Sequence, residues 1–245
     1  MDNCETSMGI QFEDREEGTV EQWRFDESVA KIFDRHIRES VPFYNEIHRM
    51  TAEISDWFVR DSSLVYDLGT STGEGVRRIF ERHRKKNLRF VAVDISKDMM
   101  AKAREKLLDV PNVQLIVSDL NNPFPIENAS LVMSIFTLQF VTPNSRPRLL
   151  RDIFNGLVEG GAFILVEKVL GETPRIDQVW MDLHHDLKRR NSIDDHEIAV
   201  KSRTLRGVLV PKSLPENMYL LRQAGFGEMD VFFKWYNWAG VLAIK

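Results

Sequence analysis

The sequence predicts an α/β fold in which a mostly parallel sheet is wound with helices, and three observations support this class. From residue 64 onward, short apolar runs alternate with helical patterns, which is the order of parallel βα units. The last two apolar runs are too close for a crossover helix, so we expect them to pair as an antiparallel hairpin. Hydrophobic residues make up 43% of the 245 residues, enough to bury the core of one such domain.

The N-terminal region precedes this alternating pattern. Residues 1–20 are polar and acidic, and we expect a mobile N-terminal segment. Residues 21–60 hold two amphipathic helices that Pro42 separates, because a proline biases the residue before it away from the helical region. Apolar residues at helical spacing mark these helices: Val29, Ile32, Phe33 and Ile37, then Ile47, Met50, Ile54, Trp57 and Phe58. We expect a helical cap over the ligand end of the sheet, with ordinary packing helices as the alternative.

Residues 61–245 are expected to form one α/β domain with a charged, largely helical insertion at about 171–210. Seven strands are predicted, at Leu64–Asp67, Arg89–Asp94, Val113–Ser118, Ala129–Phe136, Ala162–Val166, Glu228–Asn237 and Gly240–Ile244. Four helices are predicted between them, at Val76–Arg84, Asp98–Leu107, Asn144–Leu157 and Ser213–Ala224. Ser96 is a candidate N-cap, and Gly160 and Gly161 are typical of a helix C-terminus.

The bulk composition excludes several classes of protein. The formal net charge of -4 gives no long-range attraction to nucleic acid, which argues against direct nucleic-acid binding. The single cysteine, Cys4, excludes an intramolecular disulfide. No apolar run approaches the roughly 18 residues of a membrane span, and no secretory signal pattern begins the chain. We therefore expect a cytoplasmic protein without membrane contact.

A glycine-rich turn follows the first predicted strand, in the stretch Leu64–Gly75. Gly69 and Gly73 allow the backbone to approach a ligand, and the start of the next helix offers free N–H groups. The spacing Gly-x-x-x-Gly-x-Gly differs from the Gly-x-Gly-x-x-Gly fingerprint of dinucleotide-binding proteins. Asp-x-Gly-x-x-x-Gly after a first strand resembles motif I of the S-adenosylmethionine (SAM) methyltransferases.

Acidic residues stand at three successive strand ends, where ligands bind in doubly wound sheets. Asp67 ends the first strand, Asp94 ends the second, and Asp119 follows the third. Asp94 is suited to accept hydrogen bonds from a ribose diol, and Asp119-Leu120 to face an adenine. One such acid alone is more often a loop-end residue or an N-cap. Together, and without a cationic phosphate clamp, the three predict a nucleoside site for SAM rather than NAD.

Several stretches along the chain carry a closer resemblance than the glycine turn alone. They are Val65–Gly69, Ile126–Ser130, Phe136–Phe140, Gly160–Ala162, Glu167-Lys168 and His184–Arg189, with Phe25–Glu27, Ser40–Tyr44 and Ala224–Phe226. From about Trp23 to Lys245 the chain resembles the carboxy-S-adenosyl-L-methionine (carboxy-SAM) synthase family. The resemblance implies a Rossmann-like methyltransferase fold, a homodimer, and the use of SAM and prephenate to make carboxy-SAM. In that family, a partner enzyme then uses carboxy-SAM to modify a wobble uridine of tRNA.

The resemblance also implies which residues surround SAM. Carried over by position, these are Tyr44, Gly69, Thr70, Ser71, Asp94, Ile95, Asp119 and Leu120. The glycine turn adds Asp67 and Gly73, and the end of the fourth strand adds Ile135, which completes the predicted cofactor-binding set.

Two positions depart from the family pattern. Ile135 stands where the family has an asparagine, and Ser202 stands where it has an arginine that grips the added carboxylate. A carboxylate in a dry pocket without a paired cation costs several kcal/mol. Arg203 is one step along, and one step on a helix rotates a side chain by about 100°, away from that face. We therefore expect a reaction other than carboxy-SAM synthesis.

No catalytic residue is identified by a motif, so four residues are candidates: Tyr44, Phe136, Trp180 and Arg203. An aromatic ring facing the sulfonium would hold it by a cation–π contact worth roughly 0.5–2 kcal/mol. The pair His184-His185 resembles a metal ligand set, but neighbouring residues on a helix point apart. We expect a structural role for this pair and no metal.

These features predict a SAM-dependent enzyme that acts at the sulfonium, in the first place a small-molecule methyltransferase. One alternative has SAM as the sole substrate and cyclises it, releasing methylthioadenosine with azetidine-2-carboxylate or homoserine lactone. Another is carboxy-SAM synthesis from prephenate. A SAM-sensing or scaffold protein is the non-enzymatic alternative. The partners are accordingly a small-molecule substrate or SAM alone.

Overall fold

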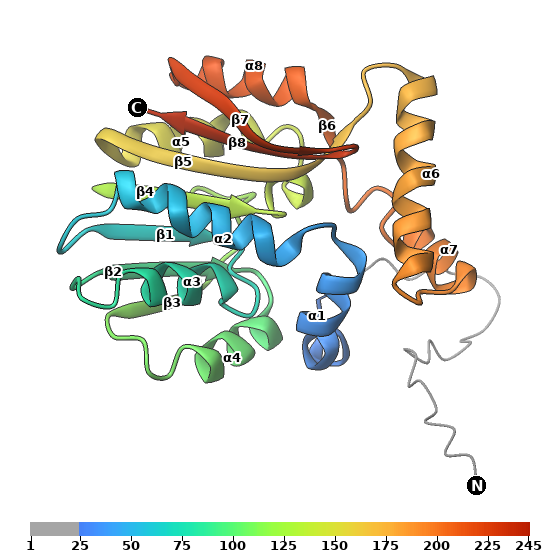
Figure 1. Ribbon diagram of the computed structural model, residues 1–245. Coiled ribbons are helices and arrows are strands. Elements are labelled where there is room, and N and C mark those ends of the chain that lie inside the picture. Colours follow the sequence, from blue (N-terminus) through green and yellow to red (C-terminus); the bar gives the residue numbers. More distant parts are fainter. Residues whose placement is uncertain (1–24) are drawn as a thin grey trace, which may run out of the picture.

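The computed structural model describes residues 25–245, so the predicted mobile segment 1–20 and the start of the cap lie outside the described residues. The strands form one mixed sheet in the order β3-β2-β1-β4-β5-β8-β7, with β6 paired to β5 (Figure 1). Their bounds are β1 Leu64–Leu68, β2 Arg89–Asp94, β3 Val113–Val117, β4 Ala129–Ile135, β5 Leu157–Leu170, β6 Lys212–Ser213, β7 Glu228–Trp235 and β8 Trp238–Ile244. β8 pairs antiparallel with β5 and β7, which confirms the predicted fold class.

Helices cover both faces of this sheet. They are α1 Glu27–Ser40, α2 Tyr44–Ile54, α3 Glu74–Arg82, α4 Lys97–Lys106, α5 Arg146–Gly156, α6 Pro174–Arg190, α7 Asp195–Thr204 and α8 Leu214–Ala224, with 3₁₀ turns η1 Ser55–Trp57 and η2 Leu138–Phe140. Alternate strand residues point to opposite faces, so Val65 packs in the core under α2 and α3, and Tyr66 in the core under α5 and α8. None of the helices between residues 25 and 245 is both long and apolar enough to cross a membrane.

Three helices, α1, α6 and α7, stand together beyond one end of the sheet (Figure 1). The imidazole of His184 on α6 donates from Nε2 to the carbonyl oxygen of Ser40, 2.9 Å away at the end of α1. Asn191 donates from Nδ2 to the carbonyl oxygen of Glu39 at 2.7 Å. These bonds fix α6 to α1 and give His184 a structural hydrogen bond.

The junction between α5 and β5 differs from the prediction. We expected the helix to end at Leu157, before a glycine signal, but it ends at Gly156 and β5 begins at once. A Cβ at Gly156 would lie 2.2 Å from the carbonyl oxygen of Ile126, so close backbone contact requires glycine there. Gly160, with φ +71°, belongs instead to an irregular stretch of the β4–β5 pairing. The two-residue strand β6 was not predicted.

Candidate active site

The glycine turn after β1 is held against the end of β2. The N–H groups of Gly69 and Thr70 both donate to the carbonyl oxygen of Val93, at 2.7 and 2.9 Å. Gly69 has φ +80°, and a Cβ there would lie 2.0 Å from Oγ1 of Thr137, in the loop after β4. Glycine is therefore required both by conformation and by the close approach of two strand-end loops.

The buried side chain of Asp67 stabilises this turn by hydrogen bonds. Its carboxylate is buried and accepts the hydroxyl hydrogen of Thr70 at 2.8 Å. Burial raises the pKa of Asp67 to about 6, although the hydrogen bond from Thr70 lowers it, and the N–H of Val76 in α3 has the same lowering effect. The carboxylate thus joins the end of β1 to the first turn of α3.

Asp94 joins the same turn to the next strand end. One carboxylate oxygen accepts the N–H of Ser71 and the other accepts the N–H of Ser96, each at 2.9 Å. Burial raises the pKa of Asp94 while these backbone bonds lower it. Ser96 also caps α4 as predicted, since its hydroxyl oxygen accepts the N–H of Met99. Asp119 accepts two hydrogen bonds from Asn121, both at 2.8 Å.

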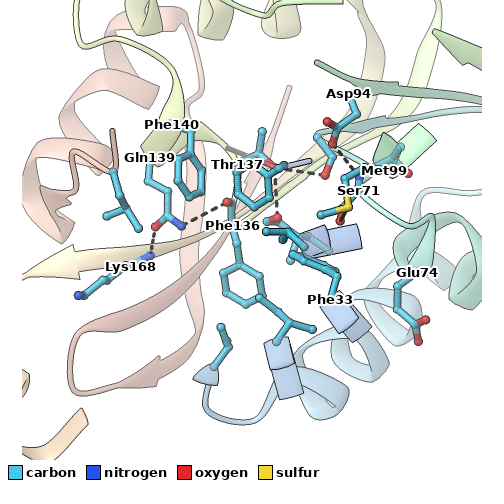
Figure 2. A pocket seen from close by; sticks show the side chains of 18 of the residues that line it. Phe33, Ser71, Glu74, Asp94, Met99, Phe136, Thr137, Gln139, Phe140 and Lys168 are labelled. Atoms are coloured by element: carbon cyan, nitrogen blue, oxygen red, sulfur yellow. Dashed lines mark hydrogen bonds between the residues drawn. The ribbon is translucent and has the colours of Figure 1, made fainter. Parts of the chain in front are cut away.

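A cavity of about 260 Å³ opens at these strand ends (Figure 2). The predicted site residues that line it are Tyr44, Asp67, Gly69, Thr70, Ser71, Asp94, Ile95, Asp119, Leu120, Ile135 and Phe136. Gly73 caps α3 behind the wall with φ +86°. Trp180 stacks on Tyr236 with 5.0 Å between ring centroids, and Arg203 is exposed on α7, so neither lines the cavity.

Known proteins with similar sequences support one family. Residues 65–161 match the family model described as a methyltransferase domain. The carboxy-S-adenosyl-L-methionine synthase of Methylococcus capsulatus is 44% identical over 92% of this chain and 95% of the relative. The enzyme of the same name from Staphylococcus epidermidis is 39% identical over 91% of this chain and 97% of that relative. The chain belongs to the carboxy-SAM synthase family.

Solved structures support the same fold at lower identity. A SAM-dependent methyltransferase from Aquifex aeolicus superposes with a TM-score of 0.58 and 18% identity, covering 90% of this chain and 99% of that one. Human N-acetylserotonin methyltransferase in complex with SAM gives a TM-score of 0.60 and 18% identity, covering 90% and 56%. These structures show the methyltransferase fold, and the family membership shown by the sequence relatives makes the chain a SAM-dependent enzyme.

The residues at the strand ends suit SAM. Positive φ angles at Gly69 and at Ser71 (φ 52°) bend the turn so that backbone, rather than side chains, faces the ligand. The Asp94 carboxylate suits the ribose hydroxyls, and Asp119 suits the adenine amino group. Among residues 25–245, no group of three or more His, Cys, Asp or Glu residues is arranged to hold a metal ion.

Aromatic side chains form the wall beside the end of β4. Tyr44 and Phe136 are stacked at an interplanar angle of 25°, and the edge of Phe136 meets Trp238 with 5.3 Å between centroids. Phe136 has φ 60°, a strained value for a bulky residue and one that clusters at functional sites. Burial raises the pKa of Tyr44, so its phenol stays protonated.

Figure 2 shows Gln139 bonded to the loop that carries Phe136, and Glu167 interacts with backbone N–H groups of the same loop. Gln139 donates to the carbonyl oxygen of Phe136 at 3.2 Å and accepts the backbone N–H of Lys168 at 2.9 Å. Glu167 is buried, and burial raises its pKa well above the ordinary value although Arg146 and backbone N–H groups of the loop lower it. Sequence reasoning did not identify these supports, although both belong to stretches that resemble the family.

Three lysines on the cavity wall were also missed by sequence reasoning. They are Lys168, Lys188 and Lys201. On α7, Lys201 lies on the wall while Ser202 is exposed and lines no part of the cavity. Position 202 therefore lies off the cavity wall, and Lys201 beside it supplies a lysine to that wall.

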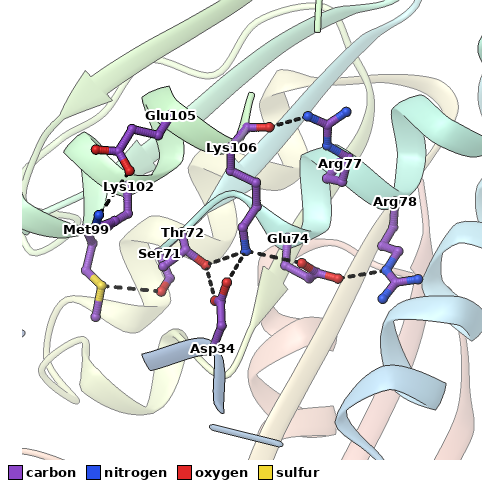
Figure 3. Close-up of polar contacts among 10 residues, drawn as sticks. All are labelled: Asp34, Ser71, Thr72, Glu74, Arg77, Arg78, Met99, Lys102, Glu105 and Lys106. Carbon is purple, nitrogen blue, oxygen red and sulfur yellow. Dashed lines mark hydrogen bonds and ion pairs between the residues drawn. The ribbon is translucent and has the colours of Figure 1, made fainter. Parts of the chain in front are cut away.

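A polar cluster fastens α1 beside the glycine turn (Figure 3). The carboxylate of Asp34 on α1 accepts the hydroxyl hydrogen of Thr72 at 2.6 Å and pairs with Lys106 Nζ at 2.6 Å. Lys106 also lies 3.3 Å from Glu74 at the start of α3. Burial raises the pKa of Asp34, but the bonds from Lys106 and Thr72 outweigh it, so the net pKa is lowered. Since Ser71 precedes Thr72, this cluster joins α1 directly to the SAM turn.

Proposed function

We propose that this enzyme transfers the methyl group of SAM to a small-molecule acceptor. One observation supports a second substrate most directly. Besides the predicted SAM-binding residues, the cavity is lined by His184, Lys188, Lys201 and Trp238, from α6, α7 and β8. These additional wall residues are available to contact a second substrate.

The residues of the cavity have separate roles in such a transfer. Asp94 and the glycine turn position SAM, whose sulfonium supplies an electrophilic methyl group. The π faces of Tyr44 and Phe136 suit a sulfonium, at roughly 0.5–2 kcal/mol for each ring. Helix α1 forms part of the cavity wall through Phe33 and Ile37, and this apolar cover limits the access of water. Catalysis then comes mainly from positioning the two reactants in line.

The test is product analysis by mass spectrometry after incubating the protein with SAM and a library of small metabolites. We expect S-adenosylhomocysteine together with one product that is heavier by a methyl group. With SAM alone, methylthioadenosine and azetidine-2-carboxylate or homoserine lactone above the spontaneous rate would instead establish cyclisation. Normal SAM binding with no product in either arm would refute methyl transfer.

Carboxy-SAM synthesis from prephenate is the second candidate, favoured by the 44% identity to a protein of that name over 95% of its length. Against it, Ile135 is 8% exposed on the cavity wall, where the family pattern has a polar asparagine. Incubation with SAM and prephenate decides between the two, because this reaction adds one carboxylate to SAM. If Ile135→Asn alone gains that product, the isoleucine is what separates this chain from its relatives.

We also propose that the protein is a homodimer, as the resemblance implies. The solvent face of α6 supports this, since Ile176 and Val179 are 41% and 46% exposed there. Light scattering during size-exclusion chromatography tests the proposal, and Val179→Glu should shift the mass toward the monomer if α6 is the interface.

A further inference from the structure

A histidine with a buried, unpaired ring nitrogen lines the cavity on the side of α2. His48 is 4% exposed and lies on the cavity wall, one helical turn after Tyr44. Its Nδ1 is buried without a hydrogen-bond partner among the residues that the structure describes. His36 and His184 also line the cavity, but each has Ser40 as a partner, through its hydroxyl at 3.0 Å and its carbonyl oxygen at 2.9 Å. His48 therefore leaves a buried polar atom unsatisfied, which favours a ligand group that can pair with the ring.

The charged groups around His48 determine what its imidazole can do. Burial lowers the pKa of His48 to about 4, so the ring is neutral at pH 7 and one of its nitrogens is a free acceptor. Glu74, which also lines the cavity, opposes this shift because its carboxylate favours the imidazolium. The other charged groups that face the ring favour the neutral form, and they are Arg38 from α1, Arg78 from α3 and Lys106 from α4. The neutral ring can therefore accept a proton, and Glu74 is the group that stabilises the charge it then carries.

Glu74 is itself held in its ionised form between two cations (Figure 3). Its carboxylate accepts from Nε of Arg78 at 2.7 Å and lies 3.3 Å from Nζ of Lys106. Burial raises the pKa of Glu74, but Lys106 and Arg78 outweigh this effect and the net pKa is lowered. The charge of His48 contributes to the same lowering. A fixed carboxylate that interacts with a neutral imidazole is the arrangement that stabilises the imidazolium formed in general base catalysis.

Tyr44 connects His48 to the aromatic wall at the end of β4. The rings of Tyr44 and His48 meet edge to face with 4.6 Å between centroids, and Tyr44 stacks on Phe136 at 25°. The faces of Tyr44 and Phe136 are the ones that suit the sulfonium of SAM. Since reacting atoms stand roughly 3–3.5 Å apart in a reactive complex, an acceptor atom also lies near these rings. His48 thus borders the part of the cavity where the acceptor binds.

We propose that His48 is the general base of the methyl transfer and that the acceptor atom is a hydroxyl oxygen. This inference deepens the proposed function and rests on it for the transfer itself. A hydroxyl is the acceptor class that needs a base most, because a neutral O–H group is a weak nucleophile until its proton leaves.

The step balances in atoms and charge. The hydroxyl proton passes to a ring nitrogen of His48 while an electron pair of the oxygen forms the bond to the methyl carbon. The C–S bond breaks with its electrons left on sulfur, which yields S-adenosylhomocysteine and an O-methyl product. The positive charge of the sulfonium is thereby replaced by that of the imidazolium, which Glu74 stabilises.

Label transfer tests the acceptor class. The protein is incubated with SAM that carries a ¹³C,²H-labelled methyl group and with the library of small metabolites, and tandem mass spectrometry locates the label. We expect the label on oxygen. A label on nitrogen, sulfur or carbon would overturn this inference and leave the proposed function standing. Absence of any labelled product would refute the proposed function, and this inference with it.

Variants at His48 test the role of the base, with the acceptor that the label identifies. His48→Gln should lower kcat at pH 7 at least a hundredfold and change the KM of the acceptor only a few-fold. The kcat of the natural protein should be independent of pH between 6 and 8, because His48 is already neutral there. The kcat of His48→Gln should instead rise about tenfold for each pH unit below the pKa of the acceptor, because the hydroxyl must then ionise without a base. A variant with the natural kcat, or with a flat profile, would overturn the proposal.

A matched control separates this role from packing. Thr51 lies on the same helix, is buried with an unpaired hydroxyl among the described residues, and lines no part of the cavity. Thr51→Val should change neither kcat nor its pH dependence, whereas Glu74→Gln should lower kcat about tenfold and keep the flat profile. Affinity for S-adenosylhomocysteine within about threefold of the natural protein shows that a variant is folded. Equal losses in Thr51→Val and His48→Gln, or loss of S-adenosylhomocysteine binding in His48→Gln alone, would overturn the proposal.

Discussion

The substitution Lys201→Met should make the unliganded protein more stable. Lys201 sits on the cavity wall near Lys188, and burial lowers its pKa from 10.5 to about 7. A lowering of this size corresponds to roughly 4–5 kcal/mol of charging penalty in the folded state. Methionine keeps most of the apolar stem and removes the amine. After allowance for the lost contact with His36, we expect a net gain of about 2–4 kcal/mol in the free energy of unfolding at pH 6.

The pH dependence of this gain has a definite sign. Because the pKa of Lys201 is lower in the folded than in the unfolded chain, the unfolded chain binds more protons between those two pKa values. The penalty is complete below about pH 7 and disappears as the pH rises toward 10.5. The stability advantage of the variant should therefore shrink between pH 7 and pH 9, by up to about 1.4 kcal/mol for each pH unit.

Urea unfolding at pH 6, 7.5 and 9, followed by tryptophan fluorescence, measures this advantage. Lys85→Met is the control, because Lys85 is exposed after the end of α3 and lines no part of the cavity. If Lys201→Met is less stable than the natural chain at pH 6, or if its advantage does not shrink by pH 9, the inference that burial destabilises the charged form of Lys201 is refuted.

Three further substitutions test the SAM half of the site. Gly69→Ala should weaken SAM at least tenfold by calorimetry, because the turn has φ +80° and the new Cβ would lie 2.0 Å from Oγ1 of Thr137. Asp94→Asn should weaken SAM by roughly ten- to a hundredfold in the same assay, since a charged acceptor for the ribose is lost; an unchanged affinity would remove Asp94 from the site. Asp34→Asn should accelerate SAM release several-fold in stopped-flow fluorescence, because it weakens the 2.6 Å ion pair with Lys106 that holds α1 closed. Unchanged release would show that α1 does not gate the cavity.

The SAM half of the site could be predicted because parallel strands bring their carboxyl ends to one edge of the sheet. Asp67, Asp94 and Asp119 are far apart in sequence, yet strand order alone places them together. The glycine turn could also be predicted, since only glycine suits the backbone conformation at Gly69. Both inferences require only the order of strands and turns in the sheet. They do not require knowledge of how helices distant in sequence pack together.

The other half of the site could not be predicted in this way. Lys188 and Lys201 lie on α6 and α7, which the sequence presents only as a charged helical insertion. Their orientation is set by contacts with α1, such as the bond from His184 to the carbonyl oxygen of Ser40. No periodic pattern records a contact of this kind. The departure at Ser202 therefore pointed to a helix of the cavity wall, but the residue of this helix that lines the cavity is Lys201.

Helix α1 contacts both halves of the site, so the binding of SAM and of the second substrate should be coupled. Through Asp34 it is fastened to Thr72, beside the turn that positions SAM. Through His36 it touches Lys201 at the far end of the cavity. Because α1 contacts both the SAM turn and the far wall of the cavity, binding at one half of the site should change the affinity of the other half. By linkage, SAM and the second substrate should change each other's affinity by the same factor.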